Sequence, residues 1–228
     1  MLEYVHENLW LVRQPLKMLG LDFGTVMTII RLEDYSLLIH SPIELNSHLL
    51  REIEALGNVK YVISPNTFHH VYGPRFMEHF PNATYYYAPG LEKKIKNKLP
   101  YIKNKQELKQ GGIIPWSRDI SHLHITGMPF VNEFVFYHKI SKTLITSNLV
   151  YVLEQGNTLW NKFLLLAMGG KAGVPSQSRL FKCCIRNKKD YNNSISMLNN
   201  WDITRMIMSH GTLWECPGKD LLPCLLAT

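Results

Sequence analysis

The feature that most constrains this chain is a pattern that occurs twice: short apolar, β-branched segments followed by helical periodicity. In the first half, strands are expected at Leu9–Val12, Thr25–Leu32, Leu37–His40 and Lys60–Ser64. In the second half, strands are expected at Ser121–Ile125, Glu133–His138, Thr143–Ser147 and Arg205–Met208. Each layer must bury an apolar face against another layer. The pattern therefore predicts an α/β (α+β) fold in which two sheets pack together with helices outside.

Three helices are expected between these strands. The first has Ser41 as its N-cap, Pro42 at its first position and Glu44 closing a capping box, and Gly57 ends it. Its apolar face carries Leu45, Leu49, Ile53 and Leu56. The other two helices are expected at Thr158–Met168 and Asp190–Asn200.

Composition is that of an ordinary globular protein. The chain has 228 residues, 46% hydrophobic and 19% charged, which fits one domain over residues 1–228 that needs no disulfide or metal to fold. The richest apolar run, Leu159–Met168, is interrupted by Asn161 and Lys162 and is too short for a membrane span. The chain start lacks a basic region, and no C-x-x-C joins the four cysteines, Cys183, Cys184, Cys216 and Cys224. We expect a cytoplasmic protein with reduced thiols.

The positive charge of the chain is concentrated in one segment. The formal net charge is +7, and the stretch Lys93–Lys109 holds seven lysines, no arginine and a single aromatic residue, Tyr101. Lysine is a point charge without the fork that reads bases, so this composition disfavours nucleic acid as a partner and favours a solvated surface. The sharper alternative is a basic rim that attracts an anionic small-molecule substrate.

Polar residues of chemical interest follow three of the predicted strands. His69 and His70 follow the strand that ends at Ser64, Asn148 follows Thr143–Ser147, and His210 follows Arg205–Met208. Ligands of open α/β structures gather beyond the carboxyl ends of strands, so these exits can converge on one cleft. Imidazole nitrogen is a ligand for zinc, iron or copper, whereas Asn148 offers only a neutral amide oxygen.

Structural roles compete with chemistry for most of these side chains. A His-His pair such as His69–His70 is more often packed or solvated than bound to metal. His122 and His124 alternate on one strand and face one side of it, which suits cross-strand packing. Asn66 fits a turn, and the vicinal thiols of Cys183 and Cys184 fit a structural role.

Four segments in order along the chain resemble a known family. They are RLEDYSLLIHSP (Arg31–Pro42), the stretch Val62–Leu91, the stretch Asn132–Tyr151 with its phrase HKISKTLITSNLV, and MIMSHG (Met206–Gly211). Together they resemble a poorly characterised bacterial branch of the metallo-β-lactamase superfamily, a domain of unknown function. The resemblance implies an αββα four-layer sandwich, two mixed sheets with helices outside, and an active site along one edge of the sheets.

The metal motifs of that superfamily are incomplete in this chain. When the motif H-x-H-x-D-H is aligned with Pro65–His70, its first two histidines fall on Pro65 and Thr67, its aspartate on His69 and its last histidine on His70. The third-motif histidine falls near Pro129 and is absent, and the bridging aspartate falls on Asn148. The final histidine is retained as His210. The resemblance thus implies a degenerate metal site whose retained ligands are His69, His70 and His210.

A neutral Asn148 cannot hold two cations together, so a dinuclear centre is not expected. The resemblance implies at most one divalent ion, with zinc favoured over iron and manganese, or none. A single ion would lower the pKa of its bound water toward about 7. Glu133 is the carboxylate expected to orient that water or to bond a ligand histidine, with Asn148 beside it and His138 as a further supporting side chain.

Two functions remain open from the sequence. One is a mononuclear metal-dependent hydrolase of an ester, thioester or phosphoester; the other is a catalytically silent binding or partner module without a functional metal site. Nucleic-acid processing through the lysine segment is disfavoured, because the metal pair that such nucleases use is missing.

Overall fold

The computed structural model describes residues 1–18, 21–22, 24–111, 114–152, 169, 173–211, 213–215 and 225. Within these residues, strands from the first half of the chain form a seven-stranded sheet in the order β1-β2-β5-β6-β7-β8-β9. Its strands are β1 (Glu3–His6), β2 (Leu9–Gln14), β5 (Thr25–Arg31), β6 (Leu37–His40), β7 (Val59–Ser64), β8 (Thr84–Tyr87) and β9 (Lys105–Glu107). The sheet is mixed: neighbours pair antiparallel from β1 to β6 and parallel from β6 to β9.

Strands from the second half form a five-stranded sheet in the order β10-β11-β12-β13-β14. They are β10 (Ile120–His124), β11 (Phe134–His138), β12 (Thr143–Thr146), β13 (Arg205–Met208) and β14 (Trp214–Glu215). Only β12 and β13 pair in parallel. A small separate hairpin joins β3 (Lys17–Met18) and β4 (Leu21–Asp22).

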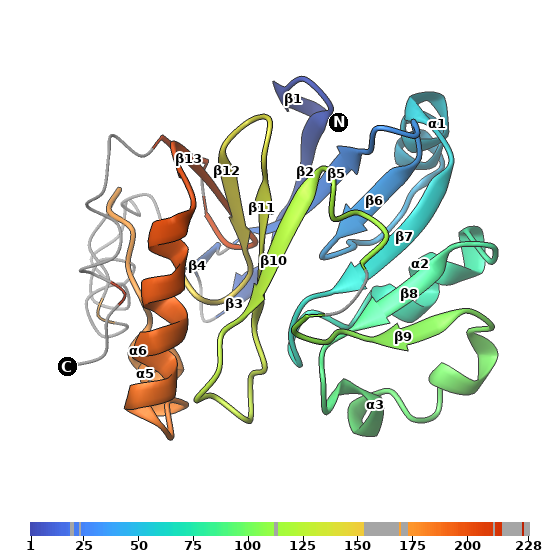
Figure 1. The fold of residues 1–228 in the computed structure, drawn as a ribbon. Helices are drawn as coiled ribbons and strands as arrows, with labels where there is room; N and C mark the ends of the chain where they lie inside the picture. Colours follow the sequence, from blue (N-terminus) through green and yellow to red (C-terminus); the bar gives the residue numbers. More distant parts are fainter. Residues whose placement is uncertain are drawn as a thin grey trace.

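Helices cover the outer face of each sheet (Figure 1). The first sheet carries α1 (Ser47–Leu56), α2 (Gly73–His79) and α3 (Leu91–Lys94), followed by the 3₁₀ turn η1 (Leu99–Tyr101). The second carries α5 (Arg179–Cys183) and α6 (Lys188–Met197), with the 3₁₀ turn η2 (Leu198–Asn200).

Alternation along each strand assigns side chains to three apolar layers. In β6, Ile39 packs toward the helices, whereas its neighbour Leu38 packs between the sheets. In β12, Leu144 faces α5 and α6, whereas Ile145 packs between the sheets. All four side chains are fully buried. The predicted fold class, an αββα sandwich of two mixed sheets, is confirmed.

The start of the first helix was predicted wrongly. Helix α1 begins at Ser47 with Asn46 as its N-cap, whose side-chain oxygen accepts the Leu49 backbone N–H at 2.8 Å. Ser41 instead has a left-handed backbone (φ 53°), and its N–H donates to the Ile63 carbonyl, so it extends the sheet. The strand pairing outcompetes the local capping pattern. The predicted helix at Thr158–Met168, with Cys216 and Cys224, lies outside the described residues.

Three smaller expectations concern the surface. No helix within the described parts of the chain is long and apolar enough to cross a membrane. Cys183 and Cys184 are free thiols. The lysines of Lys93–Lys109 are all exposed and lie in α3, in β9 and in the adjoining loops, as expected for a solvated segment.

Candidate functional site at the strand exits

Parallel pairing brings four strand exits to one edge of the sandwich. The β6–β7 pair in the first sheet and the β12–β13 pair in the second each point their carboxyl ends the same way. The two edges meet through buried serines: Ser41 follows β6, Ser147 follows β12 and Ser209 follows β13. The Ser41 and Ser147 hydroxyl oxygens are 3.3 Å apart, and the Ser209 hydroxyl donates to Ser41 Oγ at 3.2 Å. The exits of β12 and β13, two of the three predicted to converge, therefore lie together.

Asn148 and His210 follow two of these serines in the chain, and His69 lies beside both; we call His69, Asn148 and His210 the strand-exit cluster. The ring centroids of His69 and His210 are 5.2 Å apart. His69 Nε2 is 3.0 Å from the Asn148 amide oxygen, and His210 Nδ1 is 2.9 Å from the Gly24 carbonyl oxygen. An oxygen of this kind only accepts, so each ring nitrogen carries the hydrogen. The lone pairs of the two rings therefore lie on His69 Nδ1 and His210 Nε2.

Burial keeps these imidazoles neutral. It lowers the pKa of His69 to about 3, with the charge of His210 as the next cause. Burial also lowers the pKa of His210, against the opposing hydrogen bond to Gly24. At neutral pH the cluster therefore offers lone pairs rather than positive charge.

The Glu133 side chain connects the loop after β7 with the loop after β12. Its fully buried carboxylate accepts hydrogen bonds from the backbone N–H groups of Ser147 (2.8 Å) and Asn148 (3.1 Å) and from the Asn66 side-chain amide. Asn66 Oδ1 in turn accepts the backbone N–H groups of Phe68 and His69. Burial raises the pKa of Glu133 to about 7, while these hydrogen bonds oppose the rise. Glu133 lies next to Asn148 as predicted, and its hydrogen-bond partners among the described residues are amides.

His70 lies on the same loop, one residue after His69. Its Nδ1 is buried and has no hydrogen-bond partner among the described residues, and burial together with the charge of Lys94 lowers its pKa. In the described part of the chain, no three His, Cys, Asp or Glu side chains are grouped so that they could hold a metal ion. The ligand set of His69, His70 and His210 stays a prediction.

The supporting role predicted for His138 is wrong. Strand β11 runs antiparallel to β12, so His138 pairs with Thr143 at the start of β12, whereas the cluster lies beyond its end. His138 Nδ1 bonds to the Ser141 hydroxyl at 2.7 Å. His122 and His124 pack on aromatic rings of the neighbouring strand, as expected, and His124 stacks on Phe134 at 4.5 Å.

Sequence reasoning missed His40 and the serines. His40 ends β6, and neither of its buried ring nitrogens has a partner among the described residues; burial lowers its pKa to about 3. Its ring meets that of Phe136 edge-on at 5.1 Å, and it also lowers the pKa of His69. The same strand-exit rule that selected His210 would have selected His40, had it been applied to β6.

Comparison with known structures supports the architecture. A metallo-β-lactamase from Pontibacter korlensis superposes with a TM-score of 0.66 at 12% identity, covering 99% of this chain and 96% of that one. A metallo-β-lactamase from Hirschia baltica gives 0.63 at 14% identity, with coverage of 99% and 95%. The Flv1 flavodiiron core from Synechocystis sp. PCC6803 gives 0.64 at 13% identity, with coverage of 93% and 56%. At these identities the likeness shows the fold alone.

Sequence comparison identifies the family. No curated protein sequence matches the chain. One family model, described as a domain of unknown function (DUF4336), matches residues 6–162, which is more than half of the chain. The chain therefore belongs to the DUF4336 family, and it has the metallo-β-lactamase fold.

Proposed function

We propose that this protein is a small-molecule-binding domain of the metallo-β-lactamase fold that works without a catalytic metal ion. The observation that carries the proposal is that the groups beside the two clustered histidines, the Asn148 amide and the Glu133 carboxylate, are engaged in hydrogen bonds within the protein. His69 is bonded to Asn148, His210 to Gly24, and the Glu133 carboxylate to three amide donors. These contacts leave two ring lone pairs for a cation, while the carboxylate that could balance its charge is engaged by its own donors.

The donor set does not fit the metal centre that the fold suggests. A catalytic zinc ion takes three protein ligands and keeps one position open. The cluster brings together two imidazoles and a neutral amide, and the nearest carboxylate, Glu133, is buried among backbone N–H groups. Two divalent ions would sit here without any anionic ligand, at a large cost in free energy.

One further group supports an anionic ligand at this edge. Lys94 Nζ donates to the Thr67 carbonyl oxygen at 3.0 Å and lies 4.5 Å from the centre of the Phe68 ring. A positive charge is thus held beside the loop that carries His69 and His70. The charge of Lys94 would attract an anion to this edge, because the neutral imidazoles carry no charge of their own.

The second candidate function is a hydrolase of an ester, thioester or phosphoester that uses one zinc, iron or manganese ion. A specific observation favours it. In His69 and in His210, one ring nitrogen is hydrogen-bonded to an oxygen atom and the other keeps its lone pair. Histidines that bind metal ions in proteins are usually held in the same way. His70 would supply the third nitrogen. The two candidates differ in metal content.

Metal content is therefore the first test. Protein purified without a metal-affinity tag, loaded with zinc and freed of excess ion should retain less than about a tenth of an equivalent, because no three ligand side chains converge among the described residues. Elemental analysis measures this, with manganese and iron loading in parallel. One equivalent that is lost in His210→Ala, but kept in the matched control His48→Ala on the exposed face of α1, would establish the hydrolase candidate instead.

The second test adds the missing charge. We expect Asn148→Asp to raise zinc retention above the wild-type level by roughly tenfold or more, because it places an anionic oxygen beside the two imidazoles. The control is Asn199→Asp, an exposed position in η2. Zinc retention equal to that of the control would mean that an anionic oxygen at position 148 does not reach an ion held by His69 and His210, and would contradict this prediction.

A further inference from the structure

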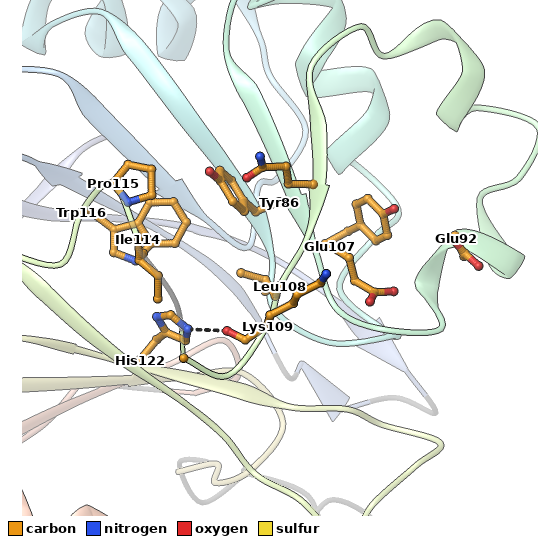
Figure 2. Close-up of a pocket in the computed structure, with 12 residues that line it drawn as sticks. Tyr86, Glu92, Glu107, Leu108, Lys109, Ile114, Pro115, Trp116 and His122 are labelled. Atoms are coloured by element: carbon orange, nitrogen blue, oxygen red, sulfur yellow. Dashed lines mark hydrogen bonds between the residues drawn. The ribbon is translucent and has the colours of Figure 1, made fainter.

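The described residues line a cavity of about 510 Å³ that is partly open to solvent and separate from the strand-exit cluster. It lies where β8, β9 and the loop after β9 face the segment before β10 and β10 itself (Figure 2). His69, Asn148 and His210 do not line it. Its volume falls within the range of small-molecule sites, roughly 300 to 1,000 Å³.

Packed aromatic rings form part of the cavity wall. Trp116 is 1% exposed and meets the Tyr86 ring edge-on, with the centroids 4.7 Å apart. Tyr61 holds the other side of the indole at 5.2 Å. Ile114 and Leu108 complete the apolar lining, and Figure 2 shows Ile114 across the space from Leu108 and Tyr86. Such a slot suits a flat ring.

The aromatic wall contains a hydrogen-bond donor without an acceptor. Trp116 Nε1 is buried and finds no partner among the described residues. Buried N–H groups are bonded in the great majority of folded proteins, so each exception calls for an explanation. The neighbouring His122 does not accept this hydrogen through Nε2, because that nitrogen donates to the Lys109 carbonyl at 3.0 Å. A ligand oxygen or nitrogen would satisfy the indole.

The rim of the cavity is acidic, in contrast to the chain as a whole. Glu92 and Glu107 line it, and both carboxylates raise the pKa of the Tyr87 phenol, after the larger effect of burial. Lys109 is the single lysine of the lining, and burial lowers the pKa of His122, which keeps that ring neutral. The lining therefore carries a net charge of about −1 at pH 7, which favours a cation.

We propose that this cavity binds a planar aromatic amine, with its ring between Tyr86 and Ile114, an acceptor atom on Trp116 Nε1 and its ammonium group near Glu92 and Glu107. This inference goes beyond the proposed function because it assigns a second site. It also stands independently of metal content, since none of its residues belongs to the strand-exit cluster.

Three matched probes test the three parts of the proposal by calorimetry. 5-Hydroxytryptamine has the ring, the ammonium group and an acceptor oxygen; 5-hydroxyindole-3-acetate reverses the charge; tryptamine lacks the acceptor. We expect the first to bind with a dissociation constant of about 1 mM or lower, and the acid to bind at least about tenfold more weakly. Equal affinity for the amine and the acid, or no saturable binding by any probe, would overturn the proposal.

Variants place the binding in the cavity. Trp116→Phe should weaken 5-hydroxytryptamine by about fivefold and leave tryptamine nearly unchanged, because only the former uses the indole N–H. Ile114→Trp should fill the slot and abolish binding, and Glu107→Gln should reduce the preference for the amine. Glu54→Gln, exposed on α1, is the control. If Ile114→Trp folds and still binds as the wild type does, the cavity is not the site. Zinc analysis of the same preparations reports separately on the proposed function.

Discussion

Glu133→Ala is expected to lower the free energy of unfolding by about 3 to 5 kcal/mol, the largest effect predicted for a single substitution here. The carboxylate is fully buried and accepts from the backbone of Ser147 and Asn148 and from the Asn66 side chain. Its removal leaves three buried donors without an acceptor. Since whole domains are stable by only about 5 to 15 kcal/mol, the variant should be close to unfolding.

Urea denaturation at pH 7 measures this loss, with two companion variants. Glu54→Ala, on the exposed face of α1, should cost less than about 0.5 kcal/mol. Glu133→Gln should cost about 1 to 3 kcal/mol. Its amide oxygen can still accept, but its NH₂ group meets the NH₂ of Asn66, whose oxygen is held by Phe68 and His69. Equal stability of Glu133→Ala and Glu54→Ala would contradict the hydrogen-bond network.

The same carboxyl gives the stability a recognisable pH dependence. Its pKa is about 7 in the folded protein against a usual 4.5, so the folded state binds the proton more tightly than the unfolded state. The stability from this group is full below about pH 4.5 and is lost as the pH rises through 7. From about pH 8 to pH 5, the wild type should therefore gain about 2 kcal/mol relative to Glu133→Gln. If the free energies of unfolding of the wild type and Glu133→Gln differ by the same amount at every pH in this range, the raised pKa of Glu133 is refuted.

Gly211→Ala is the second large effect, with an expected loss of about 3 kcal/mol or more. The residue follows His210 and has a φ of 99°, and a Cβ atom there would lie 1.7 Å from the Val152 carbonyl oxygen. Gly211 forms a parallel bridge to Val152, and its own carbonyl accepts from Arg13. Either the backbone of Val152 or that of Gly211 must move, and His210 would move with it.

Gly173→Ala is the matched control for this clash. Gly173 also has a positive φ, 68°, but a Cβ atom there would meet nothing within 4 Å. It should cost about 1 kcal/mol, the strain of the left-handed backbone alone. If urea denaturation gives the same loss for both variants, the close approach of Gly211 to Val152 is not a constraint on the fold.

Several strands were predictable from sequence because their short apolar segments are typical of buried strands. Leu37–His40 and Arg205–Met208 match β6 and β13 residue for residue, and both are short, almost wholly buried segments. A continuous apolar run of this length, bounded by turn residues, fits a strand in the interior of a sheet and little else. Gly57 likewise marked the end of α1, because the apolar face stops at Leu56.

The failures have a common origin in contacts between distant segments. Ser41 has the local pattern of a helix cap, yet its N–H bonds to Ile63 across the sheet and its hydroxyl to Ser147 of the other sheet. His138 was expected to support the site at Asn148, whereas antiparallel pairing carries it to the opposite end of β12. The aromatic cavity was not predicted at all, since Tyr86 and Trp116 come together only when the two sheets pack.

By itself, the sequence determined the layers of this protein and the list of polar residues at the strand exits, because apolar periodicity and turn residues act locally. The tertiary structure alone decided which ring nitrogen of His69 and of His210 carries a hydrogen. It also decided that the Glu133 carboxylate accepts hydrogen bonds from amide groups, and where a cavity is left between the elements. Those properties depend on distances of about 3 Å between atoms far apart in the chain. Only the packing of one sheet on the other sets such distances.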